Sequence, residues 1–350
     1  MTPSHDLTQV IPTHNRSRYL RRLLQLLSQT QCPNDILVID SSFGKEKILT
    51  ECVIEEFRHK LKLTHRHDLE DFTRKCSQAL QQVQTSYTVF CADDDFQISA
   101  SLTTACQFLD ANPDYGSCMG HALFVLPSTP VTLTRQSWST IALQSPSQRV
   151  QAISLDGNYA VFYAVHRTEL LLDRFCLARQ SCEYTRSRVL PEILLCQLCA
   201  LRGKLKVLGD TMTIRQVHPG NESSHTPCIQ ETSTFAQDYR SYRDCLAQQL
   251  QEHANLSNEE AVRFADQVFA DYDPRLNLQR RFLSGFQRRI SRVFRERRRR
   301  KLLATPKKGR KQQLSTESLE LQTTAIQQSL DLMVSHPEGL PREQSKPNAA

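Results

Sequence analysis

The amino-acid sequence predicts an α/β fold, in which a mostly parallel sheet is covered by helices on both faces. Two observations lead to this prediction. Short apolar runs alternate with apolar residues at helical spacing throughout residues 1–115. Several of these runs stop abruptly at polar residues, as strands of open α/β sheets do at the edge where ligands bind. Alternation of this kind is typical of βαβ units, whose strands run parallel.

Each element of this half follows from a local pattern. Residues 7–11 are predicted as a buried strand, and the next segment is a helix with its leucines on one face (Leu20, Leu23, Leu24 and Leu27). Asn112-Pro113 ends the last helix of this half, because this dipeptide favours a turn. Further strands are expected at 36–39, 61–64 and 87–91, and further helices at 45–60, 69–83 and 102–109.

The second half of the chain has a less regular pattern. Strands are expected at 116–126 and 159–165, with an irregular excursion at 127–150 between them. A helix at 190–201, a strand pair or extended arm at 204–214 and helices at 234–268 follow. Residues 303–350 lack a sustained apolar pattern, so most of this tail is expected to be disordered.

Charge is distributed unevenly along the chain. The formal net charge is +7, yet Arg275–Lys311 alone holds 16 Lys or Arg and one acid, so the preceding residues are slightly acidic. Phenylalanines and isoleucines recur at helical spacing within 276–301, which predicts a basic amphipathic helix. Such a helix docks on an anionic membrane surface, or it packs its apolar stripe on the domain and leaves the arginines in solvent. Nucleic acid is not an expected partner, because no binding module accompanies the charge.

The cysteines and the apolar runs indicate a cytoplasmic protein, and the basic segment is a candidate for peripheral contact with the inner face of the cell membrane. The twelve cysteines form no disulfide framework, which is typical of a reducing compartment. The short polar start is not a signal peptide, and no apolar run approaches the roughly 18 residues of a spanning helix.

Three consecutive acids, Asp93, Asp94 and Asp95, follow the apolar run at 87–91. Like charges this close raise each other's pKa unless a cation lies among them. Carboxylate oxygens suit Mg²⁺ or Mn²⁺, which take their other ligands from water and substrate phosphates. The alternative is an acidic turn in solvent. Because the runs at 7–11 and 36–39 also end in polar residues, a shared ligand site is favoured.

Three segments of the chain resemble the family 2-type glycosyltransferases of the GT-A fold. They are Val10-Ile-Pro-Thr-His-Asn-Arg16, Ile36-Leu-Val-Ile-Asp40 and Phe90-Cys-Ala-Asp-Asp-Asp-Phe96, the last similar to a bacterial branch with an "ADDDF" triplet. The resemblance covers about residues 7–220. It implies a nucleotide-diphosphate-sugar donor, with a UDP-sugar favoured, a divalent metal (Mn²⁺ or Mg²⁺), and sugar transfer with inversion to the hydroxyl of a carbohydrate or lipid-linked acceptor.

The resemblance also implies a domain plan. Residues 1–235 form the GT-A domain, with a nucleotide-sugar half at 1–115 and an acceptor half at 116–235. Residues 236–302 form a helical extension that carries the basic helix, and 303–350 form the tail.

Site residues are carried over position by position. The resemblance implies that Asp93 and Asp95 hold the metal as a DxD element, with His218 as a further metal ligand or a diphosphate partner; an ordinary loop histidine is the alternative. The residues that line the nucleotide-sugar site are Pro12, Thr13, Asn15, Arg16, Asp40, Lys75, Asp93 and Asp94.

Sugar transfer needs a base within hydrogen-bond reach of the attacking hydroxyl. Glu192 stands where the family places this acid, and Asp156 is the second candidate. Alternatively, Glu192 is simply a first-turn acid that the helix dipole favours.

Two other functions compete with the glycosyltransferase. A nucleotidyltransferase of similar fold is less favoured, because its loop after the first strand is typically glycine-rich, whereas residues 12–16 contain no glycine. The third hypothesis is a catalytically silent module that binds nucleotide sugars.

Overall fold

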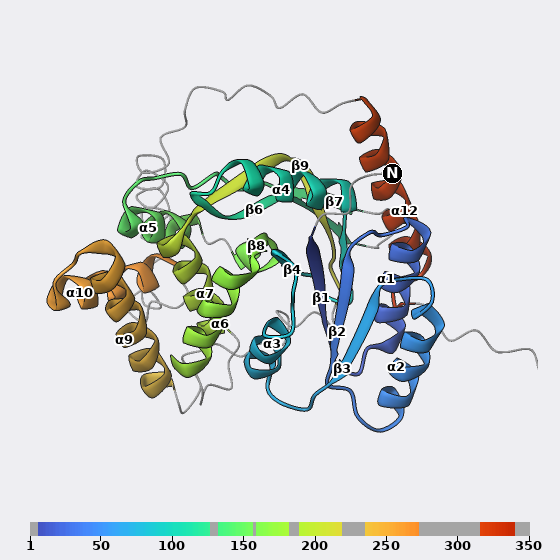
Figure 1. Ribbon diagram of the computed structural model, residues 1–350, viewed down its shortest axis with the longest axis horizontal. Coiled ribbons are helices and arrows are strands. Elements are labelled where there is room, and N and C mark those ends of the chain that lie inside the picture. The colour runs from blue at the N-terminus through green and yellow to red at the C-terminus, as the bar shows by residue number, and fades with distance from the viewer. Residues whose placement is uncertain are drawn as a thin grey trace, which may run out of the picture.

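One curled sheet runs through the middle of the molecule, with helices on both of its faces (Figure 1). The computed structural model describes residues 6–126, 132–156, 159–181, 189–218, 235–272 and 316–339. Within these ranges the strands form a nine-stranded sheet in the order β3-β2-β1-β4-β8-β6-β9-β5, and β7 pairs with β6. The predicted α/β class is confirmed.

The first half alternates strand and helix as predicted. Its elements are β1 (Leu7–Thr13), α1 (Ser17–Gln29), β2 (Asp35–Asp40), α2 (Gly44–Phe57), β3 (Leu63–His67), α3 (Phe72–Leu80) and β4 (Tyr87–Phe90). All four strands run parallel, and Thr13 at the end of β1 is paired with Asp40 at the end of β2. The polar residues that follow these strands therefore meet at one edge of the sheet.

The second half completes the sheet with strands of both directions. Its elements are β5 (Phe96–Gln97), α4 (Ser99–Ala111), β6 (Tyr115–Leu126), β7 (Thr132–Gln136), α5 (Pro146–Asp156), the 3₁₀ helix η1 (Tyr159–Tyr163), β8 (Val165–Arg167), α6 (Thr168–Ser181), α7 (Val189–Arg202), β9 (Lys204–Gln216), α9 (Phe235–Ala254) and α10 (Asn258–Tyr272). The long strands β6 and β9 pair in parallel, and β9 also pairs with the short β5. This second pairing brings the end of β9 beside the chain that leaves β4.

Several predicted elements differ from the structure. β3 begins two residues later than predicted, because this strand lies at the sheet's edge and its half-exposed residues need no continuous apolar run. Residues 159–163 form a 3₁₀ helix where a strand was expected, and only the three-residue β8 follows it. Residues 204–216 form one continuous strand, and no strand pair.

The C-terminal tail contains a helix that was not predicted. α12 (Thr316–Ser335) lies beside α1 and α4, at the right of Figure 1. Met333 is fully buried, and Ile326 and Leu330 pack against the same core as the leucines of α1. The prediction of disorder is wrong for this segment, since a few well-placed apolar residues anchor it although its composition is polar. The predicted basic helix at 276–301 lies outside the described residues.

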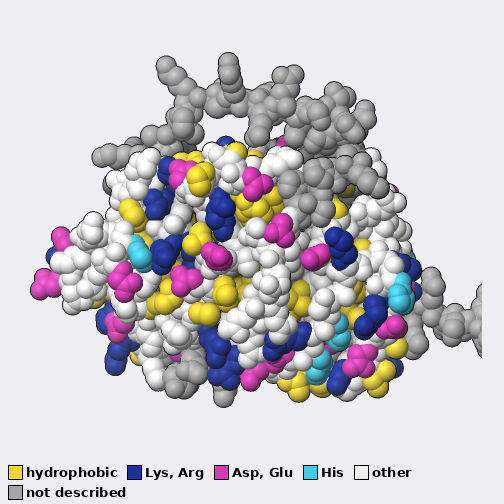
Figure 2. Space-filling view, viewed as in Figure 1, with side chains coloured by type: hydrophobic (Ala, Val, Ile, Leu, Met, Phe, Trp, Pro, Cys, Tyr) yellow, Lys and Arg dark blue, Asp and Glu magenta, His cyan; other side chains and the backbone are white. Residues whose placement is uncertain are grey.

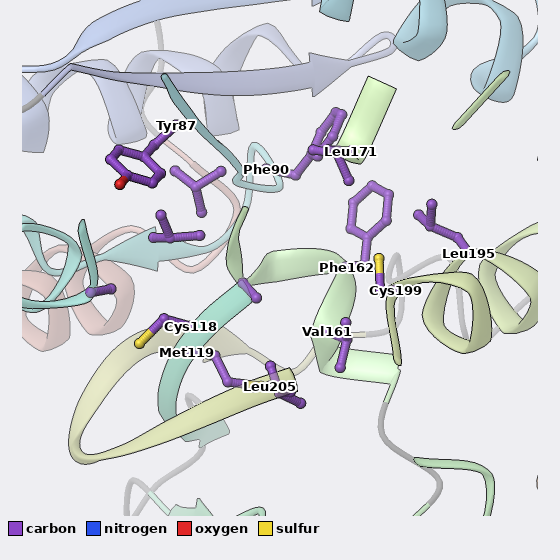
Figure 3. Packing of buried hydrophobic residues seen from close by; sticks show 14 of the residues in the cluster. Tyr87, Phe90, Cys118, Met119, Val161, Phe162, Leu171, Leu195, Cys199 and Leu205 are labelled. Carbon is purple, nitrogen blue, oxygen red and sulfur yellow. The ribbon is translucent and has the colours of Figure 1, made fainter. Parts of the chain in front are cut away.

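Two hydrophobic clusters cover the opposite faces of the sheet. Neighbouring residues of β1 show this directly, because Val10 belongs to one cluster and Ile11 to the other. In the first cluster, the Phe162 ring lies between Phe90 of β4 and Leu195 of α7, with ring centroids of Phe90 and Phe162 4.7 Å apart (Figure 3). Through this contact, η1 and α7 pack against β4, the strand that precedes the acidic triplet.

No helix in the described ranges is long and apolar enough to span a bilayer.

Close packing of β6 against β9 gives a test of the fold. A Cβ added at Gly120 would lie 2.7 Å from both the Asp210 carbonyl oxygen and Met212 Cβ. We therefore expect Gly120→Ala to lower the free energy of unfolding by about 1–3 kcal/mol, as overpacking does elsewhere. Urea unfolding measures this loss. The matched control is Gly209→Ala in β9, where nothing lies within 4 Å of the added carbon, and equal stability of the two variants would contradict the close approach.

Candidate functional site

The acidic triplet lies in a tight turn between β4 and β5. The Asp95 N–H donates to the Ala92 carbonyl at 3.1 Å, and the next residue, Phe96, pairs with Ile214 of β9. Each of the three carboxylate residues is at most 4% exposed. The turn is therefore held between two strands and its acids face inward, which excludes the alternative of an acidic turn in solvent.

Two arginines and a histidine surround the buried acids. Arg16 binds Asp93 at 2.9 Å and Asp94 at 2.7 Å, so a single guanidinium bridges two carboxylates. Arg215 at the end of β9 binds Asp95 at 3.0 Å. His218 Nε2 lies 2.8 Å from an Asp94 oxygen. The site thus contains both a concentrated negative charge and the cations that balance it.

Neutral groups complete the contacts of the outer two acids. The Thr13 hydroxyl donates to Asp93 Oδ2 at 2.8 Å. The Gln216 backbone N–H donates to Asp95 Oδ1 at 3.1 Å. Together with the arginines, these donors give every carboxylate oxygen of Asp93 and Asp95 a hydrogen-bond partner.

Burial and charge shift the three carboxyl groups in different directions. Burial raises the pKa of Asp93 to about 7, although Arg16 opposes the shift. Burial also raises the pKa of Asp95 to about 6 against the effect of Arg215. For Asp94, the contacts with His218 and Arg16 outweigh burial and lower the pKa to about 2. Within the triplet, Asp94 thus favours the anionic form most, whereas burial makes Asp93 and Asp95 harder to ionise.

The donor atoms of the triplet suit a hard divalent cation. Asp93 and Asp95 offer buried carboxylate oxygens, the ligand type that Mg²⁺ and Mn²⁺ prefer. Across the described ranges, no three Asp, Glu, His or Cys side chains converge on a common point. A cation here would therefore rely on few protein ligands and would compete with Arg16 and Arg215 for the same oxygens.

A second polar cluster lies at the ends of β2 and β3. Asp40 is fully buried, and its Oδ1 accepts the Ser42 N–H at 2.7 Å. His65 Nε2 approaches its other oxygen at 3.6 Å. Burial opposes ionisation of Asp40, but His65 and Ser42 outweigh it and keep the pKa of this carboxyl below its usual value. On the face of the molecule seen in Figure 2, several histidine side chains lie in the region of β3 and α2.

The loops after β1 and β2 are joined by Asn15. Its backbone has φ 54°, a left-handed conformation that asparagine tolerates better than most residues. The Asn15 N–H donates to Ser42 Oγ at 2.8 Å, and its side-chain oxygen accepts the Phe43 N–H at 3.1 Å. Asn15 does not cap α1, whose N-cap position is Arg16.

Lys75 and Pro12 complete the predicted nucleotide residues. Lys75 in α3 is buried, and its Nζ donates to Ser41 Oγ at 2.7 Å. Pro12 is half-buried and is paired with Ile39 of β2. All of the residues predicted to bind the nucleotide sugar therefore lie at one edge of the sheet, from Asp40 to the triplet.

Glu192 lies in the first turn of α7 and acts electrostatically on Tyr163. Arg215 lies over the Tyr163 ring, 4.8 Å from its centroid. Burial raises the pKa of Tyr163, and both Asp95 and Glu192 act on it electrostatically. Glu192 also lines a small hollow of about 10 Å³, partly open to solvent, with Phe72, Phe162, Phe175 and Leu195 among its walls. Asp156 is the last residue of α5.

Arg22 and Tyr19 are contacts of the site that the sequence analysis missed. Arg22 is fully buried, and its Nη2 donates to the Asp94 carbonyl at 3.0 Å. The Tyr19 ring stacks on His218 with centroids 5.1 Å apart. The spacing of Arg16, Tyr19 and Arg22 at i, i+3 and i+6 was the available signal, because it puts them on one face of the predicted helix.

Comparison with known proteins agrees with this arrangement. Residues 8–168 match the family model described as "Glycosyl transferase family 2". No curated protein sequence matches the chain. Among solved structures, residues 1–349 of S. aureus TarS in complex with UDP-GlcNAc align with 15% identity and a TM-score of 0.57, over 95% of this chain and 91% of that chain. The same TarS fragment in another crystal structure aligns with 17% identity and a TM-score of 0.53, over 95% and 90%.

A longer TarS structure aligns over 76% of this chain with 18% identity and a TM-score of 0.48, and this chain spans 42% of its length. The fold is that of the TarS fragment, and its first half carries the match to the glycosyl transferase family 2 model. The family 2 match covers residues 8–168, a little under half of the chain.

The raised pKa of Asp93 predicts a specific pH dependence of stability. Its value of about 7 in the folded protein exceeds the ordinary 3.8, so the folded state binds the proton more tightly than the unfolded chain. Stability from this group is therefore present below about pH 4 and is lost as the pH rises to about 7, by up to about 1.4 kcal/mol per pH unit.

Urea unfolding at pH 5 and pH 7.5 measures this loss. We expect Asp93→Asn to lose less stability than the unsubstituted protein between these two values. Substitution of the exposed Asp35 by asparagine is the control and should keep the original dependence. Parallel pH profiles for Asp93→Asn and the unsubstituted protein would exclude a buried, proton-binding Asp93.

Proposed function

We propose that this glycosyltransferase moves a sugar from a nucleotide-diphosphate donor to an acceptor hydroxyl, in a metal-dependent reaction that inverts the anomeric centre. The observation that carries the proposal is the buried triplet Asp93–Asp95 among Arg16, Arg215 and His218. Departure of a nucleoside diphosphate puts negative charge on two phosphates. A preorganised set of cations is the group that stabilises such charge most effectively.

The edge of the sheet divides into two parts with different tasks. Asp40, with the loops joined by Asn15 and Lys75 nearby, lies at the far end from the triplet and is suited to hold the nucleoside. Arg16 and His218 lie at the triplet and are suited to bind the diphosphate. The TarS fragment with a similar fold was solved with UDP-GlcNAc, which supports a UDP-sugar as the donor.

Asp93 and Asp95 would hold a divalent cation, Mn²⁺ or Mg²⁺, with His218 as a candidate third ligand. When bound, such an ion neutralises charge on the leaving diphosphate. Arg16 and Arg215 contact the same carboxylates, so these arginines are positioned to turn toward phosphate oxygens when another cation takes their place. Thr13 keeps Asp93 in orientation through its hydroxyl.

Glu192 is the proposed general base, which takes the proton of the attacking acceptor hydroxyl. Its electrostatic effect on Tyr163, which Asp95 also influences, supports a position within the same site. A single displacement by the activated hydroxyl inverts the anomeric carbon.

The acceptor and the location of the enzyme depend on parts of the chain that this site does not include. We propose a carbohydrate or lipid-linked acceptor, met in the cytoplasm at the inner face of the cell membrane. The basic stretch 276–301 would dock on anionic lipid there.

Substitution of Asp95 tests the donor site. Mn²⁺ together with UDP, GDP or TDP should raise the melting temperature of the unsubstituted protein for the preferred nucleotide, because ligands that bind the native state stabilise it. We expect Asp95→Asn to lose this shift and to reduce sugar transfer by roughly 10²–10³-fold. A full thermal shift in Asp95→Asn would show that the triplet does not bind the nucleotide. Release of pyrophosphate in place of a nucleoside diphosphate would indicate a nucleotidyltransferase.

Substitution of Glu192 tests the base separately. Glu192→Gln should keep the thermal shift with nucleotide and lower kcat by roughly 10²–10⁴-fold, the usual effect of losing a general base. Glu169→Gln is the matched control, because Glu169 is a first-turn acid of α6 and reports the effect of the helix dipole alone. If Asp156→Asn lowers kcat and Glu192→Gln does not, the base is Asp156.

A further inference from the structure

The end of α12 and the residues that follow it lie close to the acidic triplet, although they are far from it in sequence. Residues 330–339, called here the C-terminal strap, are anchored by Met333, which is fully buried in the core below α1. Beyond this anchor, Gly339 at φ 81° lies against the backbone of Arg18. The Arg18 guanidinium donates to the Gly339 carbonyl at 3.5 Å.

Two buried side chains connect the C-terminal strap to the triplet. Arg22 donates from Nη1 to the His336 carbonyl at 2.7 Å and from Nη2 to the Asp94 carbonyl at 3.0 Å. Gln216 donates from Nε2 to the Pro337 carbonyl at 2.6 Å, and its backbone N–H donates to Asp95 Oδ1. The two side chains also bind each other, because Arg22 Nη2 donates to Gln216 Oε1 at 2.6 Å.

This network depends on the strap for its acceptors. Burial lowers the pKa of Arg22 to about 10, so its guanidinium still carries a charge at neutral pH. Burial of a charge is costly unless its donors are paired, and Arg22 Nε has no hydrogen-bond partner among the described residues. The carbonyl oxygens that the strap supplies to Arg22 Nη1 and to Gln216 are therefore important for holding both side chains. Without the strap, both side chains would turn toward other acceptors or solvent, and their orientation beneath the triplet would be lost.

We propose that Arg22 and Gln216 are positioning residues, and that the C-terminal strap fixes them so that Asp94 and Asp95 are held ready for the donor. Neither side chain contacts donor or metal in this account; each acts through the triplet. The link to donor binding rests on the proposed function, whereas the link between strap and triplet does not.

Two substitutions disturb the strap from different sides. Gly339→Ala adds a carbon that would lie 2.5 Å from the Arg18 carbonyl carbon, at a backbone angle that alanine rarely adopts. Gln216→Glu keeps the backbone N–H and the acceptor for Arg22 but places a carboxylate oxygen against the Pro337 carbonyl. Gly209→Ala is the matched control, because it lies in the same strand as Gln216 and meets nothing within 4 Å.

Hydrogen exchange of the peptide that spans 91–97 is the first readout, measured on the full-length protein. We expect faster exchange there in Gly339→Ala and Gln216→Glu than in Gly209→Ala. Calorimetric binding of UDP and GDP with Mn²⁺ is the second readout, with an expected dissociation constant roughly tenfold higher in the two strap variants. With a functioning transfer assay, the KM for donor should rise while the KM for acceptor is unchanged.

The outcomes separate positioning from ordinary support of the fold. If both variants lower the melting temperature but leave exchange at 91–97 and nucleotide affinity equal to those of Gly209→Ala, the strap is only a structural element and the proposal fails. The proposal also fails if both variants keep the melting temperature and the hydrogen exchange at 91–97 of the unsubstituted protein. If the unsubstituted protein binds neither nucleotide, the proposed function fails, and hydrogen exchange alone decides whether the strap holds the triplet.

Discussion

The site depends on keeping three carboxyl groups together in a turn where each of the three acids is at most 4% exposed. Each acid would be unstable there alone, because burial of an unpaired charge is costly. Arg16 from the start of α1 and Arg215 from the end of β9 provide the balance. Arg16 follows β1 in the first half of the chain, whereas Arg215 belongs to β9 in the second half. The charged edge therefore exists only when both halves of the domain are folded together.

The sequence could predict the part of the fold that local patterns determine. The leucines of α1 and the apolar runs of β1, β2 and β4 were sufficient, because burial in a parallel sheet needs apolar residues at regular spacing. β3 was misplaced because an edge strand carries a weaker apolar signal. α12 was missed because its few buried residues, such as Met333, pack on α1, more than 300 positions earlier in the chain.

The same distinction applies to the candidate site. Asp93, Asp95, Asp40 and Arg16 could be placed at one edge of the sheet from the sequence because they follow strands, and their binding roles stay predictions. The role of Arg22 was not found, because its acceptors come from three distant segments of the chain: the triplet, the end of β9 and the residues after α12. A pattern along the chain cannot show that such acceptors converge.

Asn15 has a consequence for how nucleotide preference changes within such enzymes. It holds the loop after β1 to the loop after β2 by two hydrogen bonds, from its backbone to Ser42 and from Phe43 to its side chain. The two loops therefore form one rigid unit, which includes residues next to both Asp40 and Arg16. If Asp40 binds the nucleotide base as proposed, a change of base specificity would require both loops to change in concert, since a shift in either one would also displace Arg16, which balances the acids.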